Sequence, residues 1–181
     1  ADPVVSIVIP AHNKWRITLQ CLRSIARRTT GVSYEVILVD DASTDRTRRA
    51  GEIVPGLVRV GLNANAGFVA ACNAGARAAR GRFVLFLNND TLVTDGWLPA
   101  LVATFADRPE CAAAGAKLVY PNGSLQEAGG IVWREGEGWN FGRGGDPNSF
   151  EFNYARPVDY CSGAALMVRR DAFERVGGFD V

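Results

Sequence analysis

The sequence lacks both a dominant charge and a long hydrophobic segment. Its 20 lysines and arginines nearly balance 19 acidic residues, for a formal net charge of +1 at pH 7. The sequence therefore lacks the excess of positive charge that is typical of nucleic-acid-binding proteins. No apolar run approaches the ~20 residues that span a bilayer, and the N-terminus has no charged region followed by an apolar signal segment. We therefore expect a small-molecule partner, no nucleic acid and no transmembrane segment in this chain.

Closely spaced cysteine pairs are also missing. The four cysteines, Cys21, Cys72, Cys111 and Cys161, are scattered and form no C-x-x-C pair. Buried reduced thiols are a better explanation of this pattern than disulfides or a zinc site. The pattern suits a cytoplasmic protein, and membrane association through other parts of a longer protein stays open.

Two common nucleotide-binding signatures are absent. There is no G-x-x-x-x-G-K-[ST] phosphate loop and no G-x-G-x-x-G between a first strand and its helix. A nucleotide bound without a glycine-rich loop needs another way to neutralise its diphosphate. A divalent cation can do this with few protein ligands.

What the sequence does contain is a regular alternation of strand and helix patterns. Its 181 residues fit a single domain, 1–181. Apolar runs predict strands at 4–9, 34–39, 57–60 and 83–87, and the patterns after them predict helices at 15–25, 43–54, 68–79 and 97–105. Repeated strand-helix units predict an α/β fold whose central sheet is mainly parallel and flanked by helices.

The second half of the sequence is less regular. Strands are predicted at 112–120, 129–133 and 164–168, and a short helix runs to Val176. Residues 134–157 form a long segment rich in glycine and aromatic residues, without helical or strand periodicity. We expect an ordered loop that covers a site, in preference to a partner-binding surface.

Polar residues follow three of the predicted parallel strands. The first strand ends at Pro10 to Asn13, the second at Asp40 and Asp41, and the fourth at Asn88, Asn89 and Asp90. Ligands bind at the carboxyl ends of strands in open parallel sheets, and oxygen-bearing side chains suit Mg²⁺ or Mn²⁺. The alternative is structural: the acids would cap helices or turns, and His12 would be a hydrogen-bonded loop residue.

Five motifs carry a resemblance to a known family. They are VSIVIPAHN (5–13), VILVDDASTD (36–45), NAGFVAACN (65–73), FLNND (86–90) and GGFD (177–180). In this order and spacing they resemble the family 2 glycosyltransferases of the GT-A fold, especially bacterial polysaccharide and rhamnosyltransferase-like members. The resemblance covers essentially the whole chain.

The resemblance implies a nucleotide-diphosphate sugar donor and inversion at the anomeric carbon, with a hexosyl or deoxyhexosyl group transferred to a glycan or lipid-linked glycan. Pro10, Ala11 and His12 would border the base, and Asp41 would accept a hydrogen bond from it. Asn89 would approach the ribose, and Asp90 would hold the Mg²⁺ or Mn²⁺ ion. The other positions that the resemblance places at the nucleotide sugar are Asn13, Asn65, Gly67 and Asn88.

The resemblance leaves the catalytic base unassigned. In the family, the base belongs to an acidic pair beyond the GGFD motif, and this sequence ends at Val181. We therefore expect a C-terminally truncated fragment whose base lies beyond Val181. Two alternatives remain at this point: a nucleotide-sugar-binding module without catalysis, and a phosphoacceptor receiver-like domain in which Lys117 completes an acidic pocket.

Overall fold

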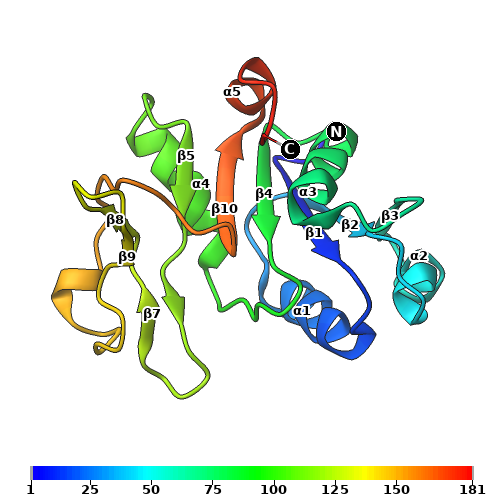
Figure 1. Ribbon diagram of the computed structural model, residues 1–181, viewed down its shortest axis with the longest axis horizontal. Coiled ribbons are helices and arrows are strands. Elements are labelled where there is room, and N and C mark those ends of the chain that lie inside the picture. The colour runs from blue at the N-terminus through cyan, green and yellow to red at the C-terminus, as the bar shows by residue number, and fades with distance from the viewer. Residues whose placement is uncertain (1, 181) are drawn as a thin grey trace.

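A six-stranded sheet forms the centre of the computed structural model, which describes residues 2–180 (Figure 1). Its strand order is β3 (Val58–Gly61), β2 (Tyr34–Asp40), β1 (Val5–Ala11), β4 (Phe83–Leu87), β10 (Ala165–Arg169) and β5 (Ala113–Gly115). Strands β1 to β4 are mutually parallel, and β10 runs antiparallel to both of its neighbours. The predicted α/β fold with a mainly parallel sheet is confirmed.

Helices cover both faces of the sheet. The helical elements are α1 (Trp15–Arg28), η1 (Arg46–Arg49), α2 (Ala50–Ile53), α3 (Gly67–Ala78), α4 (Trp97–Asp107), η2 (Phe150–Phe152) and α5 (Arg170–Arg175). Helices α1 and α4 pack on one face of the sheet, and α3 packs on the other. None of the helices within residues 2–180 is both long and apolar enough to cross a bilayer.

Strand β4 is buried on both faces, as its uninterrupted apolar run predicts. On one face the ring of Phe83 lies 4.6 Å from that of Phe105 in α4. On the other face Phe86 contacts Phe173 at 5.2 Å and Phe179 at 4.9 Å, measured between ring centroids. Because β4 supplies core residues to both layers, its end is held rigidly, and so are the polar residues that follow it.

The prediction that Pro10 stops the first strand is wrong. Strand β1 continues to Ala11, and Pro10 pairs in register with Val39 of β2. On its other side, however, β1 pairs with β4 only as far as Val8. At Pro10 the β4 side of the strand therefore has no partner, so the missing N–H removes no ladder hydrogen bond there.

Asn13, the polar residue two positions before α1, does not cap this helix. Asn13 and Lys14 both have left-handed backbones, with φ of 58° and 57°. The first N–H of the helix, from Trp15, instead donates to the carboxylate of Asp45 at 2.8 Å. Asp45 also accepts the N–H of Thr47 at 2.9 Å, so one side chain caps both α1 and η1.

The second half of the chain contains two hairpins. Strand β6 (Leu118–Val119) pairs with β7 (Leu125–Glu127), and β8 (Gly130–Val132) pairs with β9 (Gly138–Asn140). The single strand predicted at 112–120 is therefore wrong: it is divided between β5 in the central sheet and β6. The segment 134–157 has more regular structure than predicted, since it contains β9 and η2. Its function as a cover stays a prediction.

The four cysteines are unpaired, as predicted. Cys21 and Cys72 are buried, and burial raises the pKa of each thiol to about 12. Cys111 and Cys161 are half-buried. The thiols therefore serve as small apolar core and wall residues.

Candidate functional site

The ends of β1 and β2 form one continuous polar edge. The backbone N–H of Asp41 donates to the carbonyl of Ala11 at 2.9 Å, and Nδ1 of His12 lies 2.6 Å from the carbonyl oxygen of Asp41. Pro10 and Ala11 are buried in β1, and His12 is exposed beyond it. The predicted juxtaposition of this loop with Asp41 is therefore present.

Asp41 is buried and its carboxylate binds the start of α3. One oxygen accepts the N–H of Ala66 at 2.7 Å and the other accepts that of Gly67 at 2.9 Å. Asn65 lies in the same loop, and its side-chain oxygen is 3.3 Å from the N–H of Gly67. The chain thus brings together Asp41, Asn65 and Gly67, three of the predicted nucleotide-sugar positions, and gives Asp41 the structural function of a helix cap. It caps α3, and not the helix that follows Asp41 directly.

Asn13 connects the first loop to the second. Its N–H donates to Oγ of Ser43 at 2.8 Å, and its side-chain oxygen accepts the N–H of Thr44 at 2.8 Å. These bonds fix the two loops relative to each other. The sequence contained no signal for this pairing because the partners are about 30 residues apart.

Asp40 faces the neighbouring strand. It forms an ion pair with Arg59 of β3 and accepts the N–H of Ser43 at 2.9 Å. Burial alone would raise the pKa of Asp40, but the bonds from Ser43 and Arg59 outweigh it and lower the pKa. Asp40 is thus a structural carboxylate.

The end of β4 holds three polar residues in different environments. The N–H of Asn88 donates to the carbonyl of Ala164 at 3.0 Å, which fixes the loop beside β10. The side-chain N–H₂ of Asn89 donates to Oγ of Thr18 in α1 at 3.0 Å, which directs its nitrogen toward the protein. Asp90 is exposed, and within residues 2–180 its carboxylate makes no hydrogen bond or ion pair. The structural alternative, in which Asp90 caps a turn, is thus not observed: neither Thr91 nor Thr94 donates a hydrogen bond to its carboxylate.

The donor set at this edge fits a divalent ion only in part. The free carboxylate of Asp90 is a suitable oxygen ligand for Mg²⁺ or Mn²⁺. No group of three or more His, Cys, Asp or Glu side chains within the described chain gathers as a metal site. An ion at Asp90 would therefore take its remaining ligands from a bound molecule or water.

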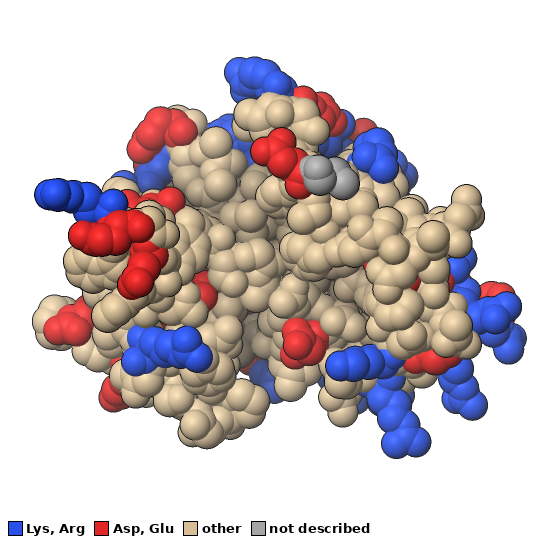
Figure 2. Space-filling view, in the orientation of Figure 1, with Lys and Arg blue, Asp and Glu red and all other residues tan. Residues whose placement is uncertain are grey.

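The face seen in Figures 1 and 2 has few charges at its centre. Lysine and arginine side chains gather at its periphery, and the middle, over β4 and β10, is largely uncharged and hollowed (Figure 2). This distribution offers an open, mainly uncharged surface between the two halves of the chain.

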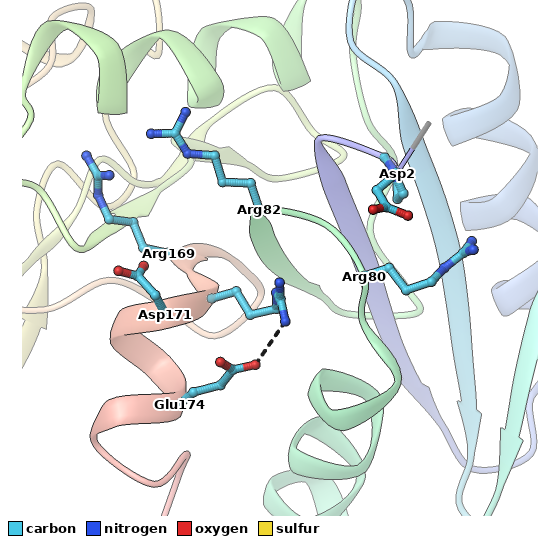
Figure 3. A pocket seen from close by; sticks show the side chains of 8 residues that line it. Asp2, Arg80, Arg82, Arg169, Asp171 and Glu174 are labelled. Carbon is cyan, nitrogen blue, oxygen red and sulfur yellow. Dashed lines mark hydrogen bonds and ion pairs between the residues drawn. The ribbon is translucent and has the colours of Figure 1, made fainter.

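A cavity of about 420 Å³ lies at the opposite edge of the sheet, where β4 begins and β10 ends (Figure 3). It is lined by arginines and acids, and three of its arginines have hydrogen-bond partners. Arg80 binds Glu35 at 2.7 Å, Arg170 binds Glu174 at 3.1 Å, and Arg169 donates to backbone carbonyls. This network lies at the amino ends of the parallel strands, away from the edge where open sheets bind ligands.

Solved structures that share this fold include the following two. A mannosyltransferase from Pyrobaculum calidifontis, solved with GDP-Man and Mn²⁺, aligns with a TM-score of 0.70 and 24% identity over 99% of this chain and 48% of its own. GalNAc-T7, solved with UDP, GalNAc and Mn²⁺, aligns with a TM-score of 0.74 and 18% identity over 98% of this chain and 37% of its own. The fold is therefore the GT-A fold of glycosyltransferases.

The family model for glycosyl transferase family 2 matches residues 6–177, so the chain belongs to that family. A curated relative, the O-antigen biosynthesis protein RfbC of Myxococcus xanthus, is 34% identical over 98% of this chain and 15% of its own length. A PGL/p-HBAD biosynthesis glycosyltransferase of Mycobacterium bovis is 30% identical over all of this chain and 65% of its own. The chain thus spans only part of these relatives.

Proposed function

We propose that this chain binds a nucleotide-diphosphate sugar at the carboxyl edge of β1, β2 and β4. In this proposal the transferred sugar goes, with inversion, to a hydroxyl of a glycan or lipid-linked glycan. The single observation that carries the proposal is the exposed carboxylate of Asp90, which follows a rigid buried strand and has no partner within residues 2–180. Family membership and the nucleotide complexes of the two structural neighbours support it.

The proposal assigns a function to the residues of this edge other than Asp40. Pro10, Ala11 and His12 border the base, and Asn13, Asn65 and Gly67 line the nucleotide side. Each carboxylate oxygen of Asp41 accepts one N–H at the start of α3 and still has a lone pair that can accept an N–H of the nucleotide base. Asn88 and Asn89 face the ribose and diphosphate.

Asp90 would hold Mg²⁺ or Mn²⁺ together with oxygens of the diphosphate. When bound, such an ion offsets the charge that develops on the departing diphosphate. Two features favour this arrangement. Within residues 2–180 the carboxylate of Asp90 has no hydrogen-bond or ion-pair partner, and it belongs to no cluster of three or more His, Cys, Asp or Glu side chains. An ion bound through a single carboxylate needs substrate oxygens, as is usual for Mg²⁺. The base that deprotonates the acceptor hydroxyl lies, in this proposal, beyond Val181.

The receiver-like alternative is excluded by the family match. It is also inconsistent with the position of Lys117, whose ammonium group binds the carbonyl of Pro147 at 2.8 Å and Asn153 at 2.6 Å. Its ammonium group is thus engaged in the second half of the chain. The second alternative, a binding module without catalysis, differs from our proposal only in turnover.

Two measurements test the proposal. Thermal unfolding with UDP, dTDP and GDP, each with and without Mn²⁺, should raise the melting temperature for at least one nucleotide. Stabilisation reaches about 2.7 kcal/mol at a hundredfold excess over Kd. Unchanged melting with all three would overturn the donor site. Donor consumption with an acceptor glycan, by this chain and by one extended past Val181, then separates a transferase from a binding module. Equal rates would contradict the position proposed for the base.

A further inference from the structure

A second cavity, of about 590 Å³, lies beside the edge strand β5. Its walls are β5, the end of β7 and the segment from Tyr154 to Ser162, which all lie in the same half of the molecule (Figure 1). The volume falls in the range of small-molecule sites. Most of the lining is apolar or aromatic, including Phe152 and Tyr160.

The wall of this cavity is tightly built. A Cβ on Gly130 would lie 2.2 Å from the ring of Tyr160, and one on Gly129 would lie 2.4 Å from Val158. The backbone of Gly130 also exchanges two hydrogen bonds with this segment, to Tyr160 at 3.0 Å and from Asp159 at 3.1 Å. The glycines thus allow the segment to pack directly on β8. The cavity is preformed, which lowers the entropic cost of binding.

Glu127 places a carboxyl group at this cavity. The residue is 3% exposed and, within the described chain, forms no ion pair. Burial raises the pKa of Glu127, and the hydrogen bond from the backbone N–H of Ser162 offsets this only in part. A buried carboxyl group without a cationic partner is costly, so a ligand hydroxyl that donates to it would be favourable.

Arg156 also lines this cavity. Its guanidinium lies over the ring of Phe141, with Cζ 3.6 Å from the ring centroid. Its Nε is the one buried side-chain nitrogen or oxygen within residues 2–180 that has no hydrogen-bond partner. Buried donors are rarely left unpaired, so a hydrogen-bond acceptor at this side chain would be favourable.

The charges of the lining indicate a neutral ligand. Three cations face three acids around the cavity: Arg108, Lys117 and Arg156 against Glu110, Glu127 and Asp159. An anion would meet the carboxyl group of Glu127, and a cation would meet Arg156. A neutral hydroxyl group, by contrast, can donate to Glu127, and another can accept from Arg156.

The cavity is close to the end of β4. Ser162, which lines the cavity together with Glu127, lies two residues before Ala164, whose carbonyl accepts the N–H of Asn88 at 3.0 Å. Two residues span at most about 7 Å of chain. A ligand at Glu127 would therefore lie beside the residues that we place at the ribose and diphosphate.

We propose that this cavity binds a neutral sugar ring of the acceptor glycan, with Glu127 and Arg156 hydrogen-bonded to its hydroxyl groups and aromatic side chains packed on its apolar face. The inference depends on the proposed function, because it assigns the acceptor side of the same site. It makes Glu127 and Arg156 acceptor-binding residues.

Methyl glycosides of neutral hexoses and 6-deoxyhexoses serve as probes. Their binding is measured by NMR titration of the 181-residue chain with nucleoside diphosphate and Mn²⁺ present. We expect at least one to shift the backbone signals of Glu127 and Ser162. Glu127→Gln and Arg156→Lys should each weaken that binding about tenfold, the effect of one charge-assisted hydrogen bond. Glu52→Gln, on the exposed helix α2, should leave it unchanged.

The same samples separate the two proposals. Loss of glycoside binding in the two variants, with the nucleotide-induced melting shift intact, supports the acceptor cavity. No shift of the Glu127 signal with any glycoside, or unchanged affinity in both variants, overturns it while the donor site stands. Absence of any nucleotide effect in the wild-type chain overturns the proposed function instead.

Discussion

The carboxylate of Asp41 accepts the backbone N–H of Gly67 at 2.9 Å, which connects the end of β2 directly to the first turn of α3. Its other oxygen accepts the neighbouring N–H of Ala66. Two donors at a helix start that would otherwise lack partners are thus satisfied by one buried side chain. The same residue therefore stabilises the fold and forms part of the polar edge where we propose that the nucleotide binds.

Asp41→Asn should destabilise the chain by about 1–2 kcal/mol, because an amide offers one acceptor oxygen where the carboxylate offers two. Urea unfolding measures the difference. Asp95→Asn is the matched control, since Asp95 forms only an exposed ion pair with Arg28. Equal unfolding midpoints for Asp41→Asn and the wild-type chain would contradict the capping function.

Gly75→Ala should destabilise the chain by about 1–3 kcal/mol through overpacking. A Cβ at Gly75 would lie 2.2 Å from Cγ1 of Val8 and 2.8 Å from Cγ2 of Val39. Both valines are buried and β-branched, so they cannot rotate away easily. The control is Gly51→Ala in α2, where the nearest atom to the new Cβ is 3.4 Å away. A Gly75→Ala variant as stable as the wild type in urea would show that α3 can shift on the sheet.

Glu35 should make stability depend on pH in the acid range. Burial would raise the pKa of Glu35, but hydrogen bonds from Ser6 at 2.7 Å and from Arg80 outweigh burial and lower it below its ordinary value of 4.5. A depressed pKa stabilises the folded state above pH 4.5, and this contribution is lost as pH falls through the folded-state pKa. Glu35→Gln should therefore cost about 1–3 kcal/mol at pH 7 and progressively less toward acid pH.

Urea unfolding of the wild type and Glu35→Gln at several pH values tests this. Glu52→Gln is the control, because its ion pair with Arg49 is exposed. If Glu35→Gln changed stability equally at pH 7 and at acid pH, the lowered pKa of Glu35 in the folded state would be contradicted.

Glu127 should make stability depend on pH in the direction opposite to that of Glu35. Its pKa is raised by burial, so the folded state favours the protonated form and loses stability as pH rises from 4.5 through the folded-state pKa. Glu127→Gln, which is neutral at every pH, should be more stable than the wild type at pH 7. The gain should disappear below pH 4.5. A variant less stable than the wild type at neutral pH would mean that the ionised carboxylate has a partner that we have not identified.

The layers of the fold were predictable because local patterns determine them. The apolar run of β4 requires burial on both faces, and the polar residues after it had to lie at the carboxyl edge of the sheet. The same argument placed Asp41 beside His12. These predictions use only strand polarity and hydrophobicity, which act over a few residues.

What the sequence did not predict depends on contacts between distant segments. Asp45 caps α1 in place of Asn13, from a loop 30 residues away. Asn73 binds the backbone of Phe179 at 2.8 and 3.0 Å, which connects α3 to the GGFD motif 106 residues later. Glu127 gave no signal because its significance comes from its burial, which depends on packing between distant segments. A clue for Asn73 was present, since it closes the NAGFVAACN motif.

The central claim is that Asp90 binds a divalent ion together with the diphosphate of a donor. The most direct test compares the melting temperatures of wild type, Asp90→Ala and Asp95→Ala with nucleoside diphosphate, in the presence and absence of Mn²⁺. Asp95 lies in the same loop and is also an exposed acid, so it controls for lost surface charge. We predict that the Mn²⁺-dependent part of the shift persists in Asp95→Ala and disappears in Asp90→Ala. An Asp90→Ala variant that keeps the full Mn²⁺-dependent shift would contradict the account.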